Sequence, residues 1–196
     1  IDMNRDPSGA SLYPGQATTE LCPTTTFDGE PLYRFDAPDE AEIMQRLNSY
    51  HRPYHDTLTT ELDRLKATHG RVVLYDAHSI RSHVPRLFDG ELPQFNIGSN
   101  DATTCAPELE TVIANICAAS GHSHVVNGRF KGGWTTRHYG RPEEGVHAIQ
   151  MELAQRGYMT ESAALTETAP LDPNPAIRPV LEQVIAATLD FAKGNS

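Results

Sequence analysis

The stretch Arg71-Val72-Val73-Leu74-Tyr75-Asp76-Ala77-His78 joins a short apolar run to an acid and a histidine. The run does not alternate with polar residues, which is typical of a strand buried on both faces, and we expect the strand to end near Tyr75. Residues two apart in an extended chain share a face. Asp76 can therefore hydrogen-bond one nitrogen of His78 and leave the other nitrogen to a metal ion. One histidine cannot hold a metal alone, so the stretch predicts only part of a metal site.

Apolar residues follow helical spacing on both sides of this strand. A long helix is expected from Asp36 or Asp39 to His69, which Gly70 ends and which Pro53 bends or splits. A second helix is expected over residues 107–120, and a last one after the cap and proline at residues 174–175. The predicted inner faces are Ile43, Leu47, Tyr50, Tyr54, Leu58, Leu62 and Leu65 on the first helix, and Ile177, Val180, Leu181, Val184, Ile185 and Leu189 on the last.

Two more strands are expected, at residues 124–127 and 146–153. Residues 1–37, which are rich in proline and glycine, are expected to form a long ordered loop, and residues 128–145 a flexible or irregular one. Helices that precede and follow buried strands indicate α/β packing. Because the chain has 196 residues and no repeat or second core, we predict one domain over residues 1–196.

Composition excludes several classes of protein. The net charge of −10 disfavours nucleic-acid binding, and no apolar run approaches the roughly 18 residues of a membrane span. The three cysteines are odd in number and widely spaced, which predicts plain thiols and a reducing cytoplasm. Residues 121–141 carry four basic side chains and no Asp or Glu, so this segment could hold a small anion. The basic residues are Arg129, Lys131, Arg137 and Arg141.

Several short motifs along the chain carry a resemblance to a known family. They are Asp2-Met3-Asn4-Arg5, Asp76-Ala77-His78-Ser79, the segment from Asn127 to Gly140, and His147-Ala148-Ile149-Gln150-Met151-Glu152, with the segments 12–16 and 96–101 between them. Each motif is weak by itself, but their order and spacing together resemble the N-formylglutamate amidohydrolases over nearly the whole chain.

The resemblance implies a fold and a reaction. That family is similar to zinc carboxypeptidases and aspartoacylases, with a three-layer α/β/α sandwich around a mixed sheet, a phosphorylase/hydrolase-like and zinc carboxypeptidase-like architecture. The implied reaction is zinc-assisted hydrolysis of the formamide of N-formyl-L-glutamate to formate and glutamate in histidine breakdown. His78 matches a zinc ligand, with Asp76 orienting its imidazole. Glu152 matches the carboxylate that takes a proton from the attacking water and delivers it to the leaving nitrogen.

The substrate implied by the resemblance is a small dianion, so two carboxylates need cations. Asn4 and Arg5 match a pair that grips one carboxylate, for which guanidinium geometry is suited. Arg137 is the candidate for the second carboxylate, with Arg129 and Arg141 as helpers. His138 and Tyr139 are candidates to contact the substrate or the oxyanion, and loop packing is the alternative for both.

The family's first two zinc ligands lie before the Asn-Arg motif, and this chain starts with Ile1 immediately before that motif. The resemblance therefore implies the C-terminal part of a longer catalytic domain, which would bind zinc poorly and be nearly inactive alone. We expect an exposed sheet edge that favours homo-oligomers or aggregation, or pairing with a complementing N-terminal segment.

Structural alternatives remain for each candidate residue: a structural histidine at His78, a surface glutamate at Glu152 and a surface ion pair between Arg5 and Asp2 or Asp6. A strand-spaced metal site at His122 and His124 is a weaker hypothesis that the resemblance does not support. Two alternative functions also stay open. One is a related zinc deacylase or carboxypeptidase acting on another acidic substrate, and the other is a noncatalytic module that binds an acidic ligand.

Overall fold

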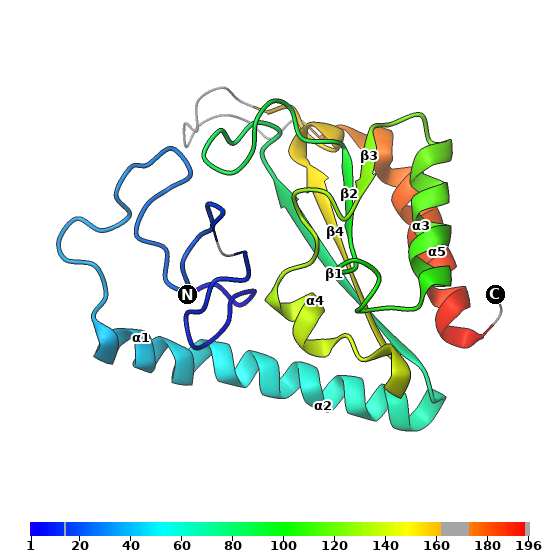
Figure 1. The fold of residues 1–196 in the computed structure, drawn as a ribbon, viewed down its shortest axis with the longest axis horizontal. Helices are drawn as coiled ribbons and strands as arrows, with labels where there is room; N and C mark the ends of the chain where they lie inside the picture. The colour runs from blue at the N-terminus through cyan, green and yellow to red at the C-terminus, as the bar shows by residue number, and fades with distance from the viewer. Residues whose placement is uncertain (14, 162–172, 195–196) are drawn as a thin grey trace.

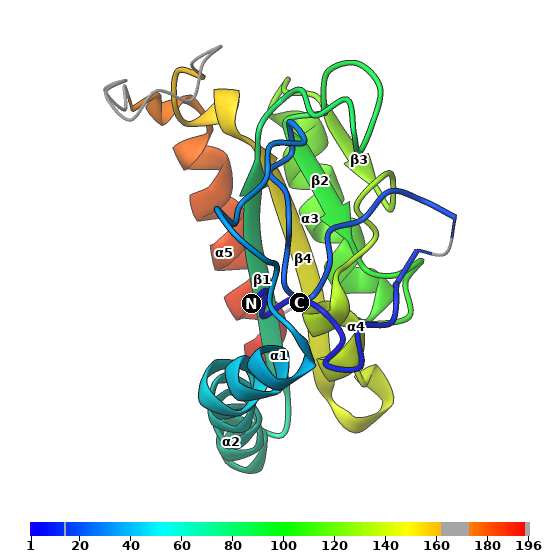
Figure 2. The ribbon, with the colours of Figure 1, turned by 90° about the vertical axis from the view of Figure 1, so that its left-hand side faces the viewer.

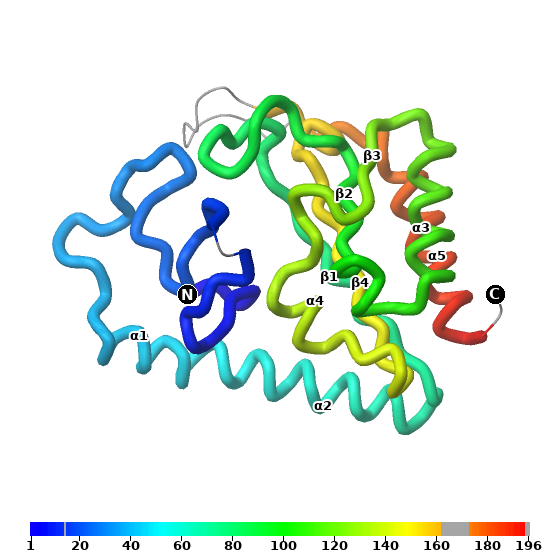
Figure 3. The backbone as a smooth tube through the Cα atoms, in the orientation of Figure 1, coloured from blue at the N-terminus to red at the C-terminus, as the bar shows by residue number. Residues whose placement is uncertain are grey.

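The computed structural model describes residues 1–13, 15–161 and 173–194. In chain order the elements are α1 (Glu40–Arg46), the π-helix η1 (Leu47–His51), α2 (Arg52–His69), β1 (Val72–Ile80), β2 (Phe95–Gly98), α3 (Pro107–Ala119), β3 (His124–Val126), α4 (Trp134–Tyr139), the 3-10 turn η2 (Pro142–Glu144), β4 (Val146–Ala154), the 3-10 turns η3 (Gln155–Gly157) and η4 (Pro175–Ile177), and α5 (Arg178–Lys193). Residues 1–37 form no helix and only one isolated bridge in their described part, and they run beside the sheet (Figure 3). The predicted ordered loop is confirmed.

The sheet has four strands in the order β1-β4-β2-β3. β1 and β4 are parallel, β2 and β3 are parallel, and β2 and β4 are antiparallel, so the sheet is mixed. The prediction that β1 ends near Tyr75 is wrong, because the strand continues through the Asp-x-His motif to Ile80, where it still pairs with Ala154. This extension matters for the site, because it places His78 directly opposite Glu152.

Helices lie on both faces of the sheet (Figures 1 and 2). On one face α3 and α5 cover Phe95, Ile97, Ile149 and Met151, all essentially inaccessible to solvent. On the other face a smaller cluster joins Leu62 of α2 and Tyr139 of α4 to the strands. Each such side chain contributes about 1.5–3 kcal/mol on burial. The α/β class with a mixed sheet is thus confirmed, whereas the complete three-layer sandwich stays a prediction.

The long helix begins and ends as predicted. The Asp39 side chain accepts from the Glu42 amide at the start, and Gly70 is left-handed at the end. Just before Pro53 the α-helical pattern is interrupted by the π-helical turn η1, which separates α1 from α2 as the predicted split and accommodates a residue without an N–H. The predicted inner face is wrong at Tyr50 and Tyr54, which are 60% and 48% exposed. The neighbouring histidines face inward instead.

Three other differences from the sequence prediction concern single elements. The expected irregular loop 128–145 contains helix α4 and a 3-10 turn. The short strand β2 had no expected counterpart, because four residues give too little pattern. On α5, Ile185 and Leu189 are 41% and 52% exposed, so they do not belong to its inner face as predicted. The remaining predicted helices and strands are confirmed within one or two residues, including the Asn174 cap.

Candidate active site

A cavity of about 730 Å³ lies where the carboxyl ends of β1 and β4 meet the irregular chain of residues 1–37. Side chains of residues 76, 78, 150 and 152 share this face because the two parallel strands are in register. The carboxyl ends of strands are common ligand sites in α/β proteins. The polar and charged residues that line the cavity are Asp2, Asn4, Arg5, Asp6, Tyr13, Thr18, Thr19, Glu20, His78, Ser79, Arg81, Arg129, Gln150, Glu152 and Gln155.

His78 is held between an acid and an amide. Its Nε2 lies 2.8 Å from Asp76 Oδ1 and 3.1 Å from Asn4 Nδ2. The second oxygen of Asp76 accepts from the hydroxyl of Thr136 at 3.1 Å, so the carboxylate is itself fixed in place. Burial opposes the charged imidazole, but the bond to Asp76 and the nearby charge of Glu152 outweigh it, so that the pKa of His78 is raised. The predicted hydrogen bond between Asp76 and His78 is confirmed.

Glu152 is 7% exposed and lies on the central strand β4 opposite His78. The alternative of a surface glutamate on an edge strand is therefore wrong. Burial raises the pKa of Glu152 to about 7, against the opposing effect of His78. Gln150 Nε2 lies 3.4 Å from its carboxylate, and Asn96 donates to its backbone carbonyl at 3.0 Å. A fixed carboxyl group with a pKa near neutrality can exchange a proton with a reacting group at neutral pH.

Arg5 reaches the cavity from the N-terminal chain. Its guanidinium donates to the carbonyl and hydroxyl of Thr19 and to the carbonyl of Asn4. It also lies 3.5 Å from Asp2, so the predicted surface ion pair is present. A guanidinium has five N–H groups, and these contacts leave donors for a ligand. The Arg5 side chain is therefore held in position and still has N–H groups that can bind a ligand.

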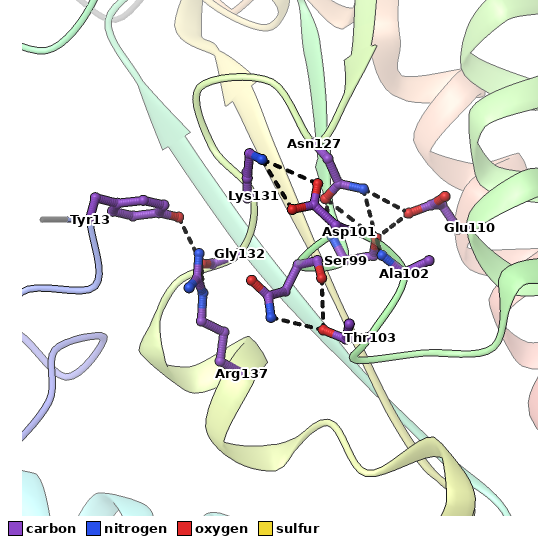
Figure 4. Close-up of polar contacts among 11 residues, drawn as sticks. Tyr13, Ser99, Asp101, Ala102, Thr103, Glu110, Asn127, Lys131, Gly132 and Arg137 are labelled. Carbon is purple, nitrogen blue, oxygen red and sulfur yellow. Dashed lines mark hydrogen bonds and ion pairs between the residues drawn. The ribbon is translucent and has the colours of Figure 1, made fainter. Parts of the chain in front are cut away.

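Tyr13 lines another part of the cavity wall and is held by the backbone of Gly132 behind it (Figure 4). The Tyr13 hydroxyl and Arg137 Nε both donate to the Gly132 carbonyl, at 2.8 and 2.9 Å, and the Arg137 guanidinium lies 4.8 Å from the Tyr13 ring centre. Arg129 lines the cavity and donates to two backbone carbonyls, those of Leu87 and Ala17. Both arginines thus fasten the cavity wall.

A strained turn supports that wall (Figure 4). Asn100, Asp101 and Ala102 are all left-handed, with φ between 50° and 62°, and the Asn100 amide donates to the Lys131 carbonyl at 2.6 Å. Asp101 and Lys131 form an ion pair at 3.1 Å. A Cβ on Gly98 would lie 2.5 Å from the backbone nitrogen of Gly132, so this close approach of two chain segments requires glycine at position 98.

Four predicted substrate contacts are not among the residues that line the cavity. One of them, Arg141, donates to the Glu144 carboxylate at 3.1 Å instead. The Arg137 guanidinium packs on the Tyr13 ring and donates to the Gly132 carbonyl. The His138 ring stacks on Trp134 with their centres 4.2 Å apart. Tyr139 is 3% exposed, and its hydroxyl lies 2.9 Å from His55 Nδ1. The structure thus brings together His78, Glu152, Asn4, Arg5 and Arg129, and it gives His138 and Tyr139 packing contacts.

The family model of N-formylglutamate amidohydrolases matches residues 1–159, which include all of these groups. The chain belongs to the N-formylglutamate amidohydrolase family. It is 52% identical over 190 residues to an N-formylglutamate deformylase of Pseudomonas aeruginosa, covering 95% of this chain and 71% of that protein. It is 49% identical over 191 residues to one of Pseudomonas putida, covering 96% and 70%.

Solved structures show the same family fold. The crystal structure of an N-formylglutamate amidohydrolase from Ralstonia eutropha JMP134 superposes with a TM-score of 0.73 at 24% identity, covering 98% of this chain and 71% of that chain. A protein from Agrobacterium tumefaciens superposes with a TM-score of 0.57 at 19% identity, covering 99% of this chain and 64% of that chain. At this level of identity the likeness supports the fold.

The described residues of this family member do not form a complete zinc site. Within residues 1–13, 15–161 and 173–194, no three His, Cys, Asp or Glu side chains converge as a metal site requires. His78 is the one imidazole that lines the cavity, whereas a catalytic zinc generally takes three protein ligands. His124 is exposed, and His122 packs against Phe95 with ring centres 6.0 Å apart, so this pair does not join His78. The described side chains thus offer a metal fewer than the three ligands that it would need.

Gln150 and Arg81 are cavity residues to which the sequence assigned no role; Gln150 was not singled out, and the role of Arg81 was left open. Gln150 stands two positions before Glu152, and the strand spacing that linked Asp76 to His78 could have found it. Arg81 lines the cavity and pairs with Asp28 at 2.9 Å. No local pattern marks Arg81, because its place depends on β1 extending to Ile80.

Proposed function

We propose that this protein hydrolyses the formamide bond of N-formyl-L-glutamate to formate and L-glutamate. The observation that carries the proposal is the convergence of Glu152, His78 and Arg5 on one cavity. Its volume of about 730 Å³ is within the usual range for small-molecule sites. The proposal is also supported by the names of the two Pseudomonas relatives.

In the proposed mechanism, Arg5 binds one substrate carboxylate through its free N–H groups, and Asn4 donates beside it. Arg129 and Arg81 are the cavity cations available to the second carboxylate, which moves the earlier assignment from Arg137 to side chains that line the cavity. A dianionic ligand needs both charges matched in a partly buried site.

Glu152 acts as general base and then as general acid. Its carboxylate takes a proton from the water whose oxygen bonds to the formyl carbon, and it then gives that proton to the amide nitrogen as the carbon–nitrogen bond breaks. The water oxygen leaves in formate, and the nitrogen becomes the amine of glutamate. A pKa of about 7 suits both proton transfers near neutral pH.

The family resemblance also implies a zinc ion, which would polarise the formyl carbonyl and acidify the water when bound. We propose His78 as one of its ligands, and the other ligands are not among the residues that the structure describes. We also propose that the reaction takes place in a reducing cytoplasm, because Cys22, Cys105 and Cys117 are buried free thiols.

The test is formate release from N-formyl-L-glutamate, compared with release of the acyl group from N-acetyl- and N-succinyl-L-glutamate. It is run on the 196-residue chain and on a chimera that adds the residues of the Pseudomonas aeruginosa relative outside the match, with zinc content measured in both. We expect zinc loading and turnover with the formyl substrate in the chimera and little of either in the chain alone. Preference for another acyl group would identify a related deacylase. Glutamate binding without hydrolysis in a zinc-loaded chimera would identify a binding module.

A further inference from the structure

Two buried histidines of the long helix bind the backbone on either side of Asn4. His55 Nε2 lies 2.9 Å from the carbonyl oxygen of Met3, and His51 Nε2 lies 3.1 Å from the carbonyl oxygen of Arg5. A carbonyl only accepts hydrogen bonds, so both imidazoles donate from Nε2. His51 and His55 are 2% and 8% exposed, so both donors lie in the interior.

The local helix geometry brings the two rings to the same side. His51 is the last residue of the π-helical turn η1 and His55 lies in the first turns of α2. Their ring centres are 4.3 Å apart. A π-helical turn shifts the faces of the residues around it, and such turns are frequent at functional sites. The shift explains why the helix buries these histidines while it exposes Tyr50 and Tyr54.

The protonation state of His55 is fixed by its surroundings. Its Nδ1 lies 2.9 Å from the Tyr139 hydroxyl, and the edge of Trp134 packs against it with ring centres 4.7 Å apart. Burial lowers the pKa of His55, so the ring is neutral at pH 7. A neutral imidazole that accepts from tyrosine at Nδ1 carries its hydrogen on Nε2, where the Met3 carbonyl accepts it.

We infer that His51 and His55 are positioning residues that hold the Asn4–Arg5 pair in its ligand-binding conformation. The Asn4 side chain lies between the Thr135 amide, at 2.8 Å, and His78, at 3.1 Å. With these two carbonyls bound as well, the Met3–Asn4 and Arg5–Asp6 peptides, which flank the Asn4–Arg5 pair, cannot rotate without losing a hydrogen bond to a buried imidazole. Irregular chain needs such anchors to present a side chain accurately.

The inference rests on the proposed function for its kinetic consequence but not for its structural one. Removing either donor should raise KM for N-formyl-L-glutamate by about 10-fold and leave kcat within about twofold, because Arg5 would bind the carboxylate equally in the ground and transition states. Independently of activity, the amides of residues 2–6 should exchange faster with deuterium.

The experiment uses paired variants of the chain and of the chimera described above. His55→Phe and His51→Phe keep a ring in the aromatic cluster but remove the donor, whereas His55→Gln and His51→Gln replace Nε2 with an amide N–H. The control is His69→Phe, at the exposed end of the same helix. Deuterium uptake at residues 2–6, L-glutamate binding by calorimetry and steady-state kinetics are compared. If a Phe variant does not fold, His55→Asn, whose amide stops short of the Met3 carbonyl, takes its place.

We expect the Phe variants to exchange faster and to bind more weakly, the Gln variants to recover most of both, and the control to match the parent protein. Parent-like exchange at residues 2–6 in folded Phe variants, or no recovery by Gln, overturns the inference. A parent chimera that exchanges slowly at residues 2–6 but neither binds L-glutamate nor releases formate overturns the proposed function instead and leaves the positioning role supported by its exchange data.

Discussion

Replacing Glu152 with glutamine should lower the activity of the protein but raise its stability. The variant keeps the shape and the hydrogen-bonding reach of the side chain but cannot take up a proton. Loss of a positioned general acid–base group typically costs about 10²–10⁴ in kcat. At the same time the substitution removes a carboxyl group that is buried on the central strand and costs folding free energy whenever it is ionised.

The size of the stability effect follows from the pKa of Glu152. Its rise from 4.5 to about 7 on folding corresponds to about 3 kcal/mol. Between these pH values the folded state binds more protons than the unfolded state, so this carboxyl makes the free energy of unfolding fall as pH rises. Below pH 4.5 the effect is absent, and above pH 7 it is complete. Relative to the parent protein, Glu152→Gln should therefore gain about 3 kcal/mol between about pH 4 and pH 8.

The assay combines urea unfolding of both proteins across this pH range with formate release by the active chimera. Glu143→Gln, at an exposed position, serves as the matched control and should change neither quantity. A stability difference that stays constant with pH would refute the assignment of a raised pKa to Glu152. Activity within tenfold of the parent would refute its catalytic role.

Three further predictions test other parts of the molecule. Arg5→Lys should raise KM roughly 10- to 100-fold with little change in kcat, measured by initial rates, because an ammonium cannot form the paired hydrogen bonds of a guanidinium; an unchanged KM would exclude the clamp. Gly98→Ala should lower the free energy of unfolding by roughly 1–3 kcal/mol in urea titrations, because its Cβ would lie 2.5 Å from the backbone nitrogen of Gly132. Parent-like stability would show that the backbone near Gly132 can move to make room. Burial lowers the pKa values of His55, His138 and His147, so in the Glu152→Gln background these three rings should lower the free energy of unfolding as pH drops below about 6.5. The raised pKa of His78 opposes them in this range, and a free energy of unfolding that rises as pH drops would contradict the three buried neutral rings.

The sequence predicted the central fold well where a physical pattern was long or sharply ended. The long helix has a capping acid, seven residues at helical spacing and a terminal glycine, and β4 is a mostly apolar run; both were found. The end of β1 was missed because polar residues usually mark the end of a buried strand. Here they continue it, since His78 faces the cavity and Asp76, on the same face of the strand, binds His78.

The core of the site was predictable because it depends on strand spacing and on short motifs. Asp76 and His78, two positions apart, share a face by geometry alone, and β4 places Glu152 beside them. The orientation of side chains on irregular chain was not predictable. Arg137 and Tyr139 lie in the same basic, glycine-rich segment as Arg129, yet only Arg129 lines the cavity. Which of these side chains points into the cavity depends on helix α4, and its six residues are too few to give a recognisable helical pattern.

The same limit explains why His51 and His55 escaped notice while two tyrosines beside them were assigned to the core. Apolar periodicity assumes that the inner face of a helix meets other apolar side chains. This helix instead meets the backbone carbonyls of Met3 and Arg5, which need hydrogen-bond donors where the helix covers them. The helix face that packs against this irregular chain therefore carries hydrogen-bond donors, His51 and His55, instead of the tyrosines. Inward-facing donors on a helix that covers a long loop indicate that the loop backbone is held there, and with it the functional side chains that the loop carries.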